Sequence, residues 1–242
     1  MTAGTELAAV AAGGGPRAWM SWSSGKDSAL ALHEVRAAGD VEVVGLLTTV
    51  NAEAGRVAMH GVRRSLLDAQ ADALGLRLHV VDLPWPCSDE TYQERMAAAV
   101  ADARADDVEV VVFGDLFLED IRRYREEMLA GSGLSARFPL WRRPTDAVAG
   151  QLVALGVRAV VTCVDLRRLP RELAGRWYDE AFLADLPPGV DPCGENGEFH
   201  TLVVAAPGFA RPLDVTVGET LERDGFAYAD VLPAATPPGA RR

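Results

Sequence analysis

A short turn rich in serine and glycine joins the first apolar strand pattern of the chain to its first helical pattern. The turn, Trp22–Ser28 or WSSGKDS, follows the apolar residues 17–22, and we call it the Ser/Gly loop. Apolar residues then recur at helical spacing at Ala31 and Val35, and Gly39 is a helix stop. A strand, a tight turn and a helix in this order are typical of α/β folds, in which the helix N-terminus can bind an anion.

Strand and helix patterns continue to alternate as far as residue 113. The run Val41–Val50 is rich in β-branched residues, which is typical of a strand buried on both faces. The expected strands are 17–22, 41–50, 76–83 and 108–113, and the expected helices are 28–38, 62–73 and 88–104. This alternation predicts an α/β, Rossmann-like, mostly parallel sheet with helices on both faces.

After Asp115 the pattern is less regular. Helices are expected at 118–129 and 145–155, strands at 157–164 and 199–204, and a long turn-rich loop at 186–197. We place a boundary near residue 135. It divides a nucleotide-binding domain, 17–135, from a smaller α/β subdomain, 136–232, that binds the substrate. Residues 1–16 and 233–242 are expected to be flexible because they are rich in Ala, Gly and Pro.

Charge and composition exclude several classes of protein. The 24 basic and 35 acidic residues give a net charge of −11, which disfavours binding to nucleic acid. We interpret the short arginine clusters as solvated faces; their members are Arg122, Arg123, Arg125, Arg142, Arg143, Arg167 and Arg168. No apolar run reaches the ~18 residues that cross a bilayer, and the N-terminus lacks a basic start, so a cytoplasmic protein is expected. The three cysteines form no C-x-x-C pair, and Cys193 is interpreted as a small buried residue.

The Ser/Gly loop carries groups suited to a polyphosphate. Gly25 has no side chain, so an anion can approach the backbone closely, and Lys26 is the only lysine of the chain. Hydroxyl donors come from Ser23, Ser24 and Ser28. Asp27 follows the lysine where a Walker A loop has Ser or Thr, so the loop is of another type.

A second motif lies near the end of the long loop. Residues 191–203 read DPCGENGEFHTLV, and we call residues 191–198 the acidic loop. Within this loop Gly194 and Gly197 permit a tight turn, and Glu195 and Glu198 supply carboxylates. His200 follows the loop and supplies an imidazole. Such a loop can hold a ligand. A surface turn with solvated acids, followed by an edge strand, is the alternative.

Together the two motifs resemble those of a known family. The Ser/Gly loop is similar to the Ser-Gly-Gly-x-Asp-Ser signature of the PP-loop ATP pyrophosphatases, with Ser24 in place of the first Gly. The Ser/Gly loop together with the segment GENGEFHT, Gly194–Thr201, resembles the motif pair of the diphthine–ammonia ligase family. Two further segments also resemble this family, HGVR at 60–63 and FGDLFLEDIR at 113–122. The resemblance implies the HUP-type variant of the Rossmann-like fold. Asn196 and His200 stand where the family has Gly and Glu. Because the chain lacks the further C-terminal domains of longer members, we assign it to a bacterial-type branch.

The resemblance also implies a reaction. An acceptor carboxylate attacks the α-phosphorus of ATP, and ammonia or an amine then displaces AMP to form an amide. By this resemblance the catalytic residues are Lys26, Glu195, Glu198 and His200. Mg²⁺ is expected to be bound by Asp27 and Asp115. ATP contacts are expected from Ser23, Ser24, Gly25, Lys26, Asp27, Ser28, Thr48, His60, Gly114 and Asp115. Acceptor contacts are expected from Gly194, Glu195, Asn196, Gly197 and Glu198.

Several points stay open at this stage. The acceptor, a small molecule or a protein side chain, is unidentified, and a homodimer is an option. His60 and His200 can equally be structural residues. A PP-loop enzyme that modifies tRNA and a non-catalytic sensor of ATP or AMP are the alternatives.

Overall fold

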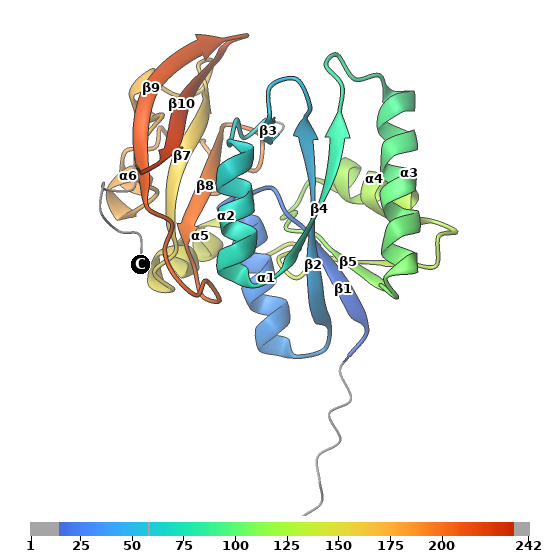
Figure 1. Ribbon diagram of the computed structural model, residues 1–242. Coiled ribbons are helices and arrows are strands. Elements are labelled where there is room, and N and C mark those ends of the chain that lie inside the picture. Colours follow the sequence, from blue (N-terminus) through green and yellow to red (C-terminus); the bar gives the residue numbers. More distant parts are fainter. Residues whose placement is uncertain (1–14, 58, 235–242) are drawn as a thin grey trace, which may run out of the picture.

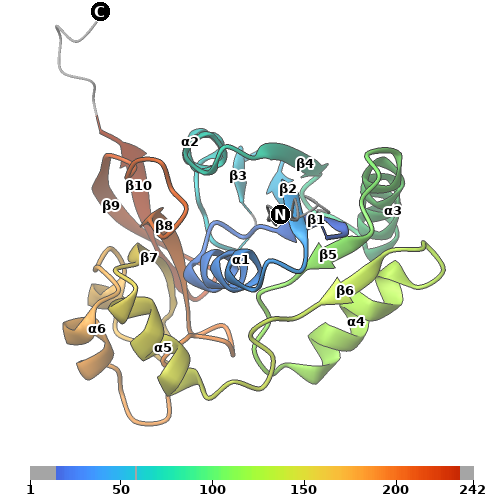
Figure 2. The same ribbon diagram turned by 90° about the horizontal axis from the view of Figure 1, so that it is seen from below.

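The chain forms two β-sheets with two helices between them (Figures 1 and 2). The structure is a computed structural model, and it describes residues 15–57 and 59–234. Most of the segments predicted to be flexible lie outside these residues. At their inner edges, the carbonyl of Pro16 accepts a hydrogen bond from the Glu42 amide, and Pro233 is the last residue of a strand.

The first sheet is mostly parallel, as the alternation of strands and helices predicts. Its strands are β1 (Arg17–Ser21), β2 (Glu42–Asn51), β3 (Arg56–Val57), β4 (Arg77–Leu83), β5 (Val110–Val112) and β6 (Ser135–Arg137). Their order is β3-β2-β1-β5-β6, β4 also pairs with β2, and β3 alone is antiparallel to its neighbour. β3 and β6 were not predicted, because two or three residues show no periodicity.

Helices cover both faces of this sheet. They are α1 (Lys26–Ala38), α2 (Arg64–Leu74), α3 (Asp89–Ala105) and α4 (Glu119–Leu129). α1 and α2 cover one face, and α3 and α4 cover the other (Figure 1). The predicted ends are confirmed: Gly39 and Gly75 adopt left-handed φ values of 66° and 64°, and the Ser88 hydroxyl accepts a hydrogen bond from the Thr91 amide.

The second sheet is antiparallel. Its strands are β7 (Arg158–Asp165), β8 (Phe199–Ala205), β9 (Val215–Arg223) and β10 (Phe226–Pro233), in the order β8-β7-β10-β9. The helices of this half are α5 (Thr145–Ala154) and α6 (Glu180–Ala184), with a 3₁₀ turn at Arg171–Leu173. The hairpin of β9 and β10 was missed, although Asp224–Gly225, with φ values of 53° and 80°, is a strong turn signal.

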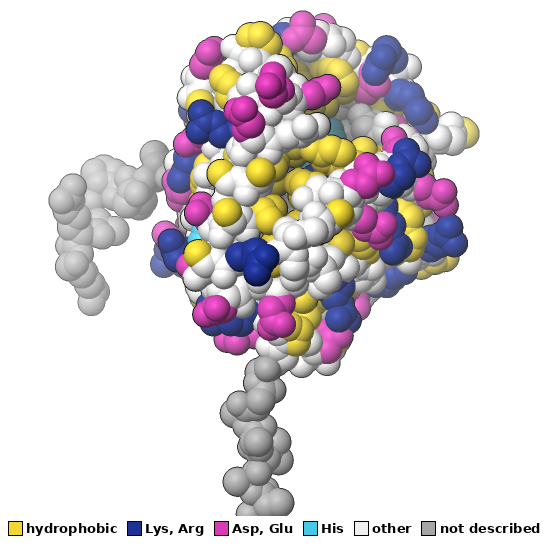
Figure 3. All heavy atoms as spheres, turned by 90° about the vertical axis from the view of Figure 1, so that its right-hand side faces the viewer, with side chains coloured by type: hydrophobic (Ala, Val, Ile, Leu, Met, Phe, Trp, Pro, Cys, Tyr) yellow, Lys and Arg dark blue, Asp and Glu magenta, His cyan; other side chains and the backbone are white. Residues whose placement is uncertain are grey.

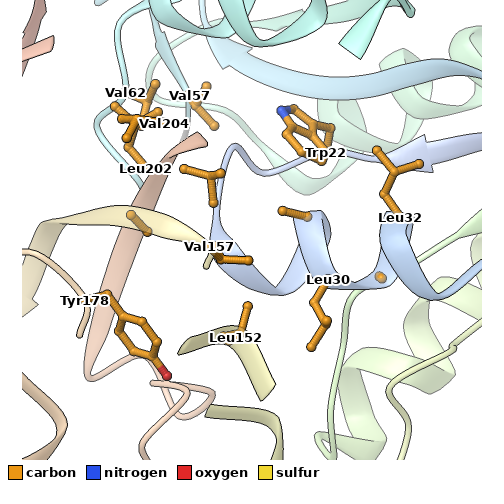
Figure 4. Close-up of a cluster of buried hydrophobic side chains, with 14 of the residues drawn as sticks. Trp22, Leu30, Leu32, Val57, Val62, Leu152, Val157, Tyr178, Leu202 and Val204 are labelled. Carbon is orange, nitrogen blue, oxygen red and sulfur yellow. The ribbon is translucent and has the colours of Figure 1, made fainter. Parts of the chain in front are cut away.

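α1 and α2 lie between the two sheets, and their packing joins both halves of the chain in one core (Figure 2). In Figure 4, Leu30 of α1 lies beside Leu152 of α5 and Val157, while Leu202 of β8 lies near Val57 and Val62. The Val203 amide of β8 donates to the carbonyl of Ser24. The second sheet therefore brings the end of the acidic loop against the Ser/Gly loop.

The strand order also places a site. From β1 the chain moves to β2 and β4 on one side, and later to β5 and β6 on the other. The carboxyl ends of β1 and β5 therefore lie at a topological switch point, where open α/β sheets bind ligands. In the described part of the chain, no helix has both the length and the apolar character needed to cross a membrane.

Candidate functional site

A cavity of about 530 Å³ lies at the carboxyl ends of β1, β2, β4 and β5. α3 and α4 form one wall, and the acidic loop with the start of β8 forms another. The space-filling view of the α3 and α4 side shows a hollow bordered by hydrophobic side chains (Figure 3). Most of the predicted site residues line the cavity: Ser23, Lys26, Asp27, Ser28, Thr48, His60, Gly114, Asp115, Gly194, Glu195 and His200. The others are not part of its lining: Ser24, Gly25, Asn196, Gly197 and Glu198.

The Ser/Gly loop presents the N-terminus of α1 to this cavity. Gly25 is the N-cap, with φ −90° and ψ 170°, and has no side chain to cap the helix, so the first helical amide, that of Lys26, donates to the Thr201 hydroxyl instead. A Cβ at Gly25 would lie 2.9 Å from Cε1 of His60, so packing requires a glycine here. The first N–H groups of a helix have no partner within it and carry partial positive charge. The loop can therefore receive an anion.

Gly114 allows a second close approach. A Cβ there would lie 3.0 Å from the amide nitrogen of Ser28 and 3.0 Å from the carbonyl carbon of Asp27. The segment after β5 thus lies directly on the first turn of α1. This contact brings Asp115 to the cavity beside Asp27.

Lys26 joins the Ser/Gly loop to the acidic loop. Its side chain is 2% exposed, and Nζ lies 2.8 Å from the Asp27 carboxylate and donates to the carbonyl of Cys193. The rings of Tyr178 and Phe199 lie 5.5 Å and 5.3 Å from Nζ. Burial opposes the charged form, but Asp27, Cys193 and Glu195 together outweigh it, so the pKa of Lys26 is raised and the ammonium is stable. The cation is largely neutralised within the protein.

Three carboxyl groups gather in the cavity, those of Asp27, Asp115 and Glu195. Burial raises the pKa of each, and that of Glu195 reaches about 7. The charge of Asp27 contributes to the raised pKa of the other two. One oxygen of Glu195 accepts hydrogen bonds from the amides of Leu116, at 2.7 Å, and Phe117, at 3.3 Å. The cavity floor thus carries negative charge that a cation, a proton or a hydrogen-bond donor would stabilise.

Glu198 shapes the acidic loop from inside. It is 1% exposed, and it accepts hydrogen bonds from the Asp191 amide, the Asn196 amide and side chain, and the Arg168 guanidinium. Gly194 and Gly197 have φ values of 69° and 81°, as their predicted turn requires. The alternative of a turn with solvated acids is wrong for Glu198. This carboxylate instead fixes the loop that holds Glu195 in the cavity.

Two histidines lie side by side at the junction of the halves. The ring centroids of His60 and His200 are 4.6 Å apart, and Nδ1 of His60 lies 3.1 Å from the carbonyl of Thr201. The Thr201 hydroxyl accepts a hydrogen bond from the Lys26 amide at 3.1 Å. Burial lowers the pKa of His60 to about 4 and that of His200 well below its usual 6.5, so both rings are neutral at pH 7. The lowered pKa makes His200 a weak base and leaves it as a neutral hydrogen-bonding group.

Two polar side chains hold the start of the Ser/Gly loop. Gln70 of α2 is fully buried; its oxygen accepts from the Trp22 indole at 2.9 Å, and its nitrogen donates to the carbonyls of Ser24 and Val203. The Thr48 hydroxyl donates to the Trp22 carbonyl. Sequence reasoning missed Gln70, although its place four residues after Leu66, on the apolar face of the helix, was a signal.

Ion pairs and a thiol complete the surroundings. Asp230 of β10 pairs with Arg56 and Arg63 of the first half. The HGVR segment therefore bonds to the second sheet at both of its ends, through His60 and Arg63. Burial raises the pKa of the Cys193 thiol to about 12, which agrees with a buried residue rather than a nucleophile.

The buried polar atoms without a hydrogen-bond partner gather at this site. Within the residues that the structure describes they are Oγ of Ser24, Nε of Arg125 and Nε2 of His200. Ser24 belongs to the Ser/Gly loop, and the other two side chains line the cavity. Since buried polar groups are nearly always bonded, the partnerless atoms of the two cavity-lining residues, Arg125 and His200, indicate that a polar ligand completes the site.

Comparisons with known proteins agree with the two motifs. Residues 17–136 match the family model described as the diphthamide synthase N-terminal domain, and residues 145–231 match the diphthamide synthase C-terminal domain. A diphthine–ammonia ligase of Danio rerio is 29% identical over 123 residues. This match covers 47% of the present chain and 47% of the relative, so the chain spans about half of that protein's length.

Proposed function

The chain belongs to the diphthamide synthase family, and on that premise we propose that it is an ATP-dependent ligase that forms an amide and releases AMP. In the reaction, a carboxylate oxygen of the acceptor attacks the α-phosphorus of ATP. Pyrophosphate leaves, and an acyl-adenylate forms. The nitrogen of ammonia or an amine then attacks the acyl carbon, AMP leaves, and the nitrogen loses a proton.

The observation that carries the proposal is that two buried polar side-chain atoms without a partner, Nε of Arg125 and Nε2 of His200, belong to residues that line the cavity. The N-terminus of α1 would hold the phosphates with the amides that follow that of Lys26, which is bonded to Thr201, and with the hydroxyls of Ser23 and Ser28. The end of β2, at Leu47–Thr49, lines the same cavity and would receive the adenine. Both assignments use groups that already face the cavity.

The residues of the acidic loop would orient the acceptor. Glu195 reaches the cavity floor, and its pKa near 7 lets it accept or release a proton near neutral pH. His200 is neutral and its lowered pKa makes it a weak base, so its partnerless Nε2 would orient the attacking nitrogen or the acceptor by a hydrogen bond. Glu198 would act by holding the loop in shape. Lys26 would act mainly by joining the two loops.

The donor set fits Mg²⁺ in part. Carboxylate oxygens of Asp27 and Asp115 are the hard ligands that this ion prefers, and burial beside each other raises the pKa of both. In the described residues, no group of three or more acidic, histidine or cysteine side chains is arranged to hold a metal ion. Asp27 and Asp115 would therefore share the ion with phosphate oxygens and water. When bound, the ion would supply positive charge opposite the phosphates.

The test is an incubation of the chain with ATP, Mg²⁺, ammonium and a panel of carboxylates, with the nucleotide products separated. We expect AMP and pyrophosphate in amounts that depend on the carboxylate. Asp115→Asn should lower the rate by roughly 100-fold or more, as loss of one electrostatic group in an active site does. Asp120→Asn, a change at an exposed position on the following helix, is the matched control and should leave the rate unchanged.

Other products would contradict the proposal. Release of ADP and phosphate would mean cleavage at the wrong bond. Binding of ATP with no turnover for any carboxylate would favour a nucleotide sensor, and salt-sensitive binding of tRNA would favour an RNA-modifying enzyme. Equal rates for Asp115→Asn and Asp120→Asn would show that Asp115 has no part in the reaction.

A further inference from the structure

One arginine differs from the others in the two arginine clusters. Six of the seven have a carboxylate within 4.0 Å. These pairs are Arg122–Glu126, Arg123–Glu127, Arg142–Glu119, Arg143–Glu34, Arg167–Asp165 and Arg168–Glu198. The prediction of a solvated face is confirmed for Arg123, Arg142 and Arg167, whose side chains are 70–76% exposed, whereas the other three are 32–42% exposed. Arg125 has no such partner within residues 15–57 and 59–234, and its interpretation as part of a solvated face is wrong, because it lines the cavity.

The surroundings of Arg125 hold its guanidinium in place. The side chain comes from α4, and the central guanidinium carbon lies 5.2 Å from the centroid of the Phe113 ring. Its Nε is buried and bonds to no described group. Ile121, one turn earlier on α4, and Leu118, the N-cap of that helix, line the same wall, and their side chains offer no acceptor. A planar cation that packs on a ring and keeps free N–H groups is arranged for bidentate binding.

The charges of the cavity give this cation a distinct role. The cavity-lining cations among the described residues are Lys26 and Arg125. Lys26 is already paired with Asp27, whereas Arg125 lies near Asp115 but beyond ion-pair distance and only lowers its pKa. An anionic ligand that enters beside Asp27, Asp115 and Glu195 needs positive charge to offset theirs. Arg125 is the described cavity cation that remains available for this.

We propose that Arg125 is the anion-binding residue of the cavity, and that its guanidinium forms a bidentate contact with an oxyanion of the ligand. The oxyanion is a phosphate group of the nucleotide or the carboxylate of the acceptor. This inference rests on the proposed function for the identity of the ligand. Its geometric basis, a partnerless guanidinium in a cavity, does not depend on the reaction.

Calorimetric titration of the full chain tests the proposal. The probes are adenosine, AMP, ATP with Mg²⁺, pyrophosphate and succinate. Arg125→Gln should weaken at least one anionic probe by about tenfold or more, since a charge-assisted hydrogen bond contributes that much, and should leave adenosine unchanged. If the affinity for AMP, ATP or pyrophosphate falls, the anion that Arg125 binds is a phosphate. If only the affinity for succinate falls, the anion is a carboxylate.

Two further variants make the result decisive. Arg123→Gln changes an exposed arginine on the same helix and should bind every probe as the wild type does. Arg125→Lys keeps the charge but not the planar fork, so it should show a smaller loss for the same probe even if Arg125→Gln fails to fold. The proposal is overturned if the Arg125 variants bind all anions like the wild type, if the wild type binds none of them, or if adenosine weakens equally. AMP production by the wild type is a separate readout for the proposed function.

Discussion

Replacement of Gln70 by leucine tests whether the Ser/Gly loop is held in place by the buried amide of this side chain. Leucine has a similar volume but no polar atom in its side chain. The change removes the acceptor of the Trp22 indole N–H and the donors to the carbonyls of Ser24 and Val203. Because Gln70 is fully buried, water cannot replace these bonds without disruption of the core.

The size of the effect follows from the groups left without partners. A buried donor without an acceptor costs about 1–3 kcal/mol, and each hydrogen bond lost at a carbonyl costs about 1 kcal/mol. The Ser24 carbonyl keeps the hydrogen bond from the Val203 amide, so its loss is only partial. We expect Gln70→Leu to lower the free energy of unfolding by about 3–4 kcal/mol, and ATP affinity to fall with it.

Urea unfolding measures this difference. Gln93→Leu, the same change at an exposed helical position, is the matched control and should shift the free energy of unfolding by less than about 0.5 kcal/mol. In a Trp22→Phe background the indole N–H is absent, so Gln70→Leu should cost about 1–3 kcal/mol less. A cost below about 1 kcal/mol in the wild type, or no coupling to Trp22, would show that the buried amide of Gln70 does not hold the Ser/Gly loop.

Four further outcomes are expected. Ser24→Gly should raise the free energy of unfolding, measured in urea, by about 1 kcal/mol, because glycine adopts the φ of 70° without strain and the buried hydroxyl without a partner is gone. A decrease would count against this. The rate of AMP release should rise with pH through about 7 as Glu195 ionises, and Glu195→Gln should remove this rise; an identical profile would contradict it. The pKa of His60 is about 4 in the folded chain and about 6.5 in the unfolded chain, so the unfolded state takes up the proton first as the pH is lowered. As the pH is lowered from 6.5 to 4, the free energy of unfolding of the wild type should therefore fall relative to that of His60→Gln, by up to about 1.4 kcal/mol per pH unit. A relative rise as the pH is lowered would contradict this. Lys26→Met should lower stability by about 2–3 kcal/mol besides slowing AMP release, because it leaves Asp27 unpaired; unchanged urea unfolding would show that the ion pair is unimportant.

The first half of the fold was predictable because its signals are local. Gly39, Gly75 and Ser88 end or begin helices through their own backbone or side-chain chemistry, and the strands between them are apolar runs. β9 could not be recognised from hydrophobicity, because most of its side chains are exposed. Its pairing with β10 is instead signalled by the Asp224–Gly225 turn between the two strands.

The site was predictable in its segments but not in its contacts. The Ser/Gly loop and Glu195 meet at one cavity, as their motifs predicted. That Lys26 bonds to the carbonyl of Cys193 could not be deduced, because the partners are far apart in the chain. The same applies to Arg125, which differs from its neighbours only by the direction that α4 gives it.

Calorimetry with a series of adenine nucleotides measures whether the Ser/Gly loop holds a polyphosphate. ATP, ADP, AMP and adenosine share the base and ribose but differ in their phosphates. We predict that affinity in the presence of Mg²⁺ rises along the series from adenosine to ATP, by at least about tenfold overall. Equal affinity for adenosine and ATP, or no heat with any of them at millimolar concentration, would contradict this prediction.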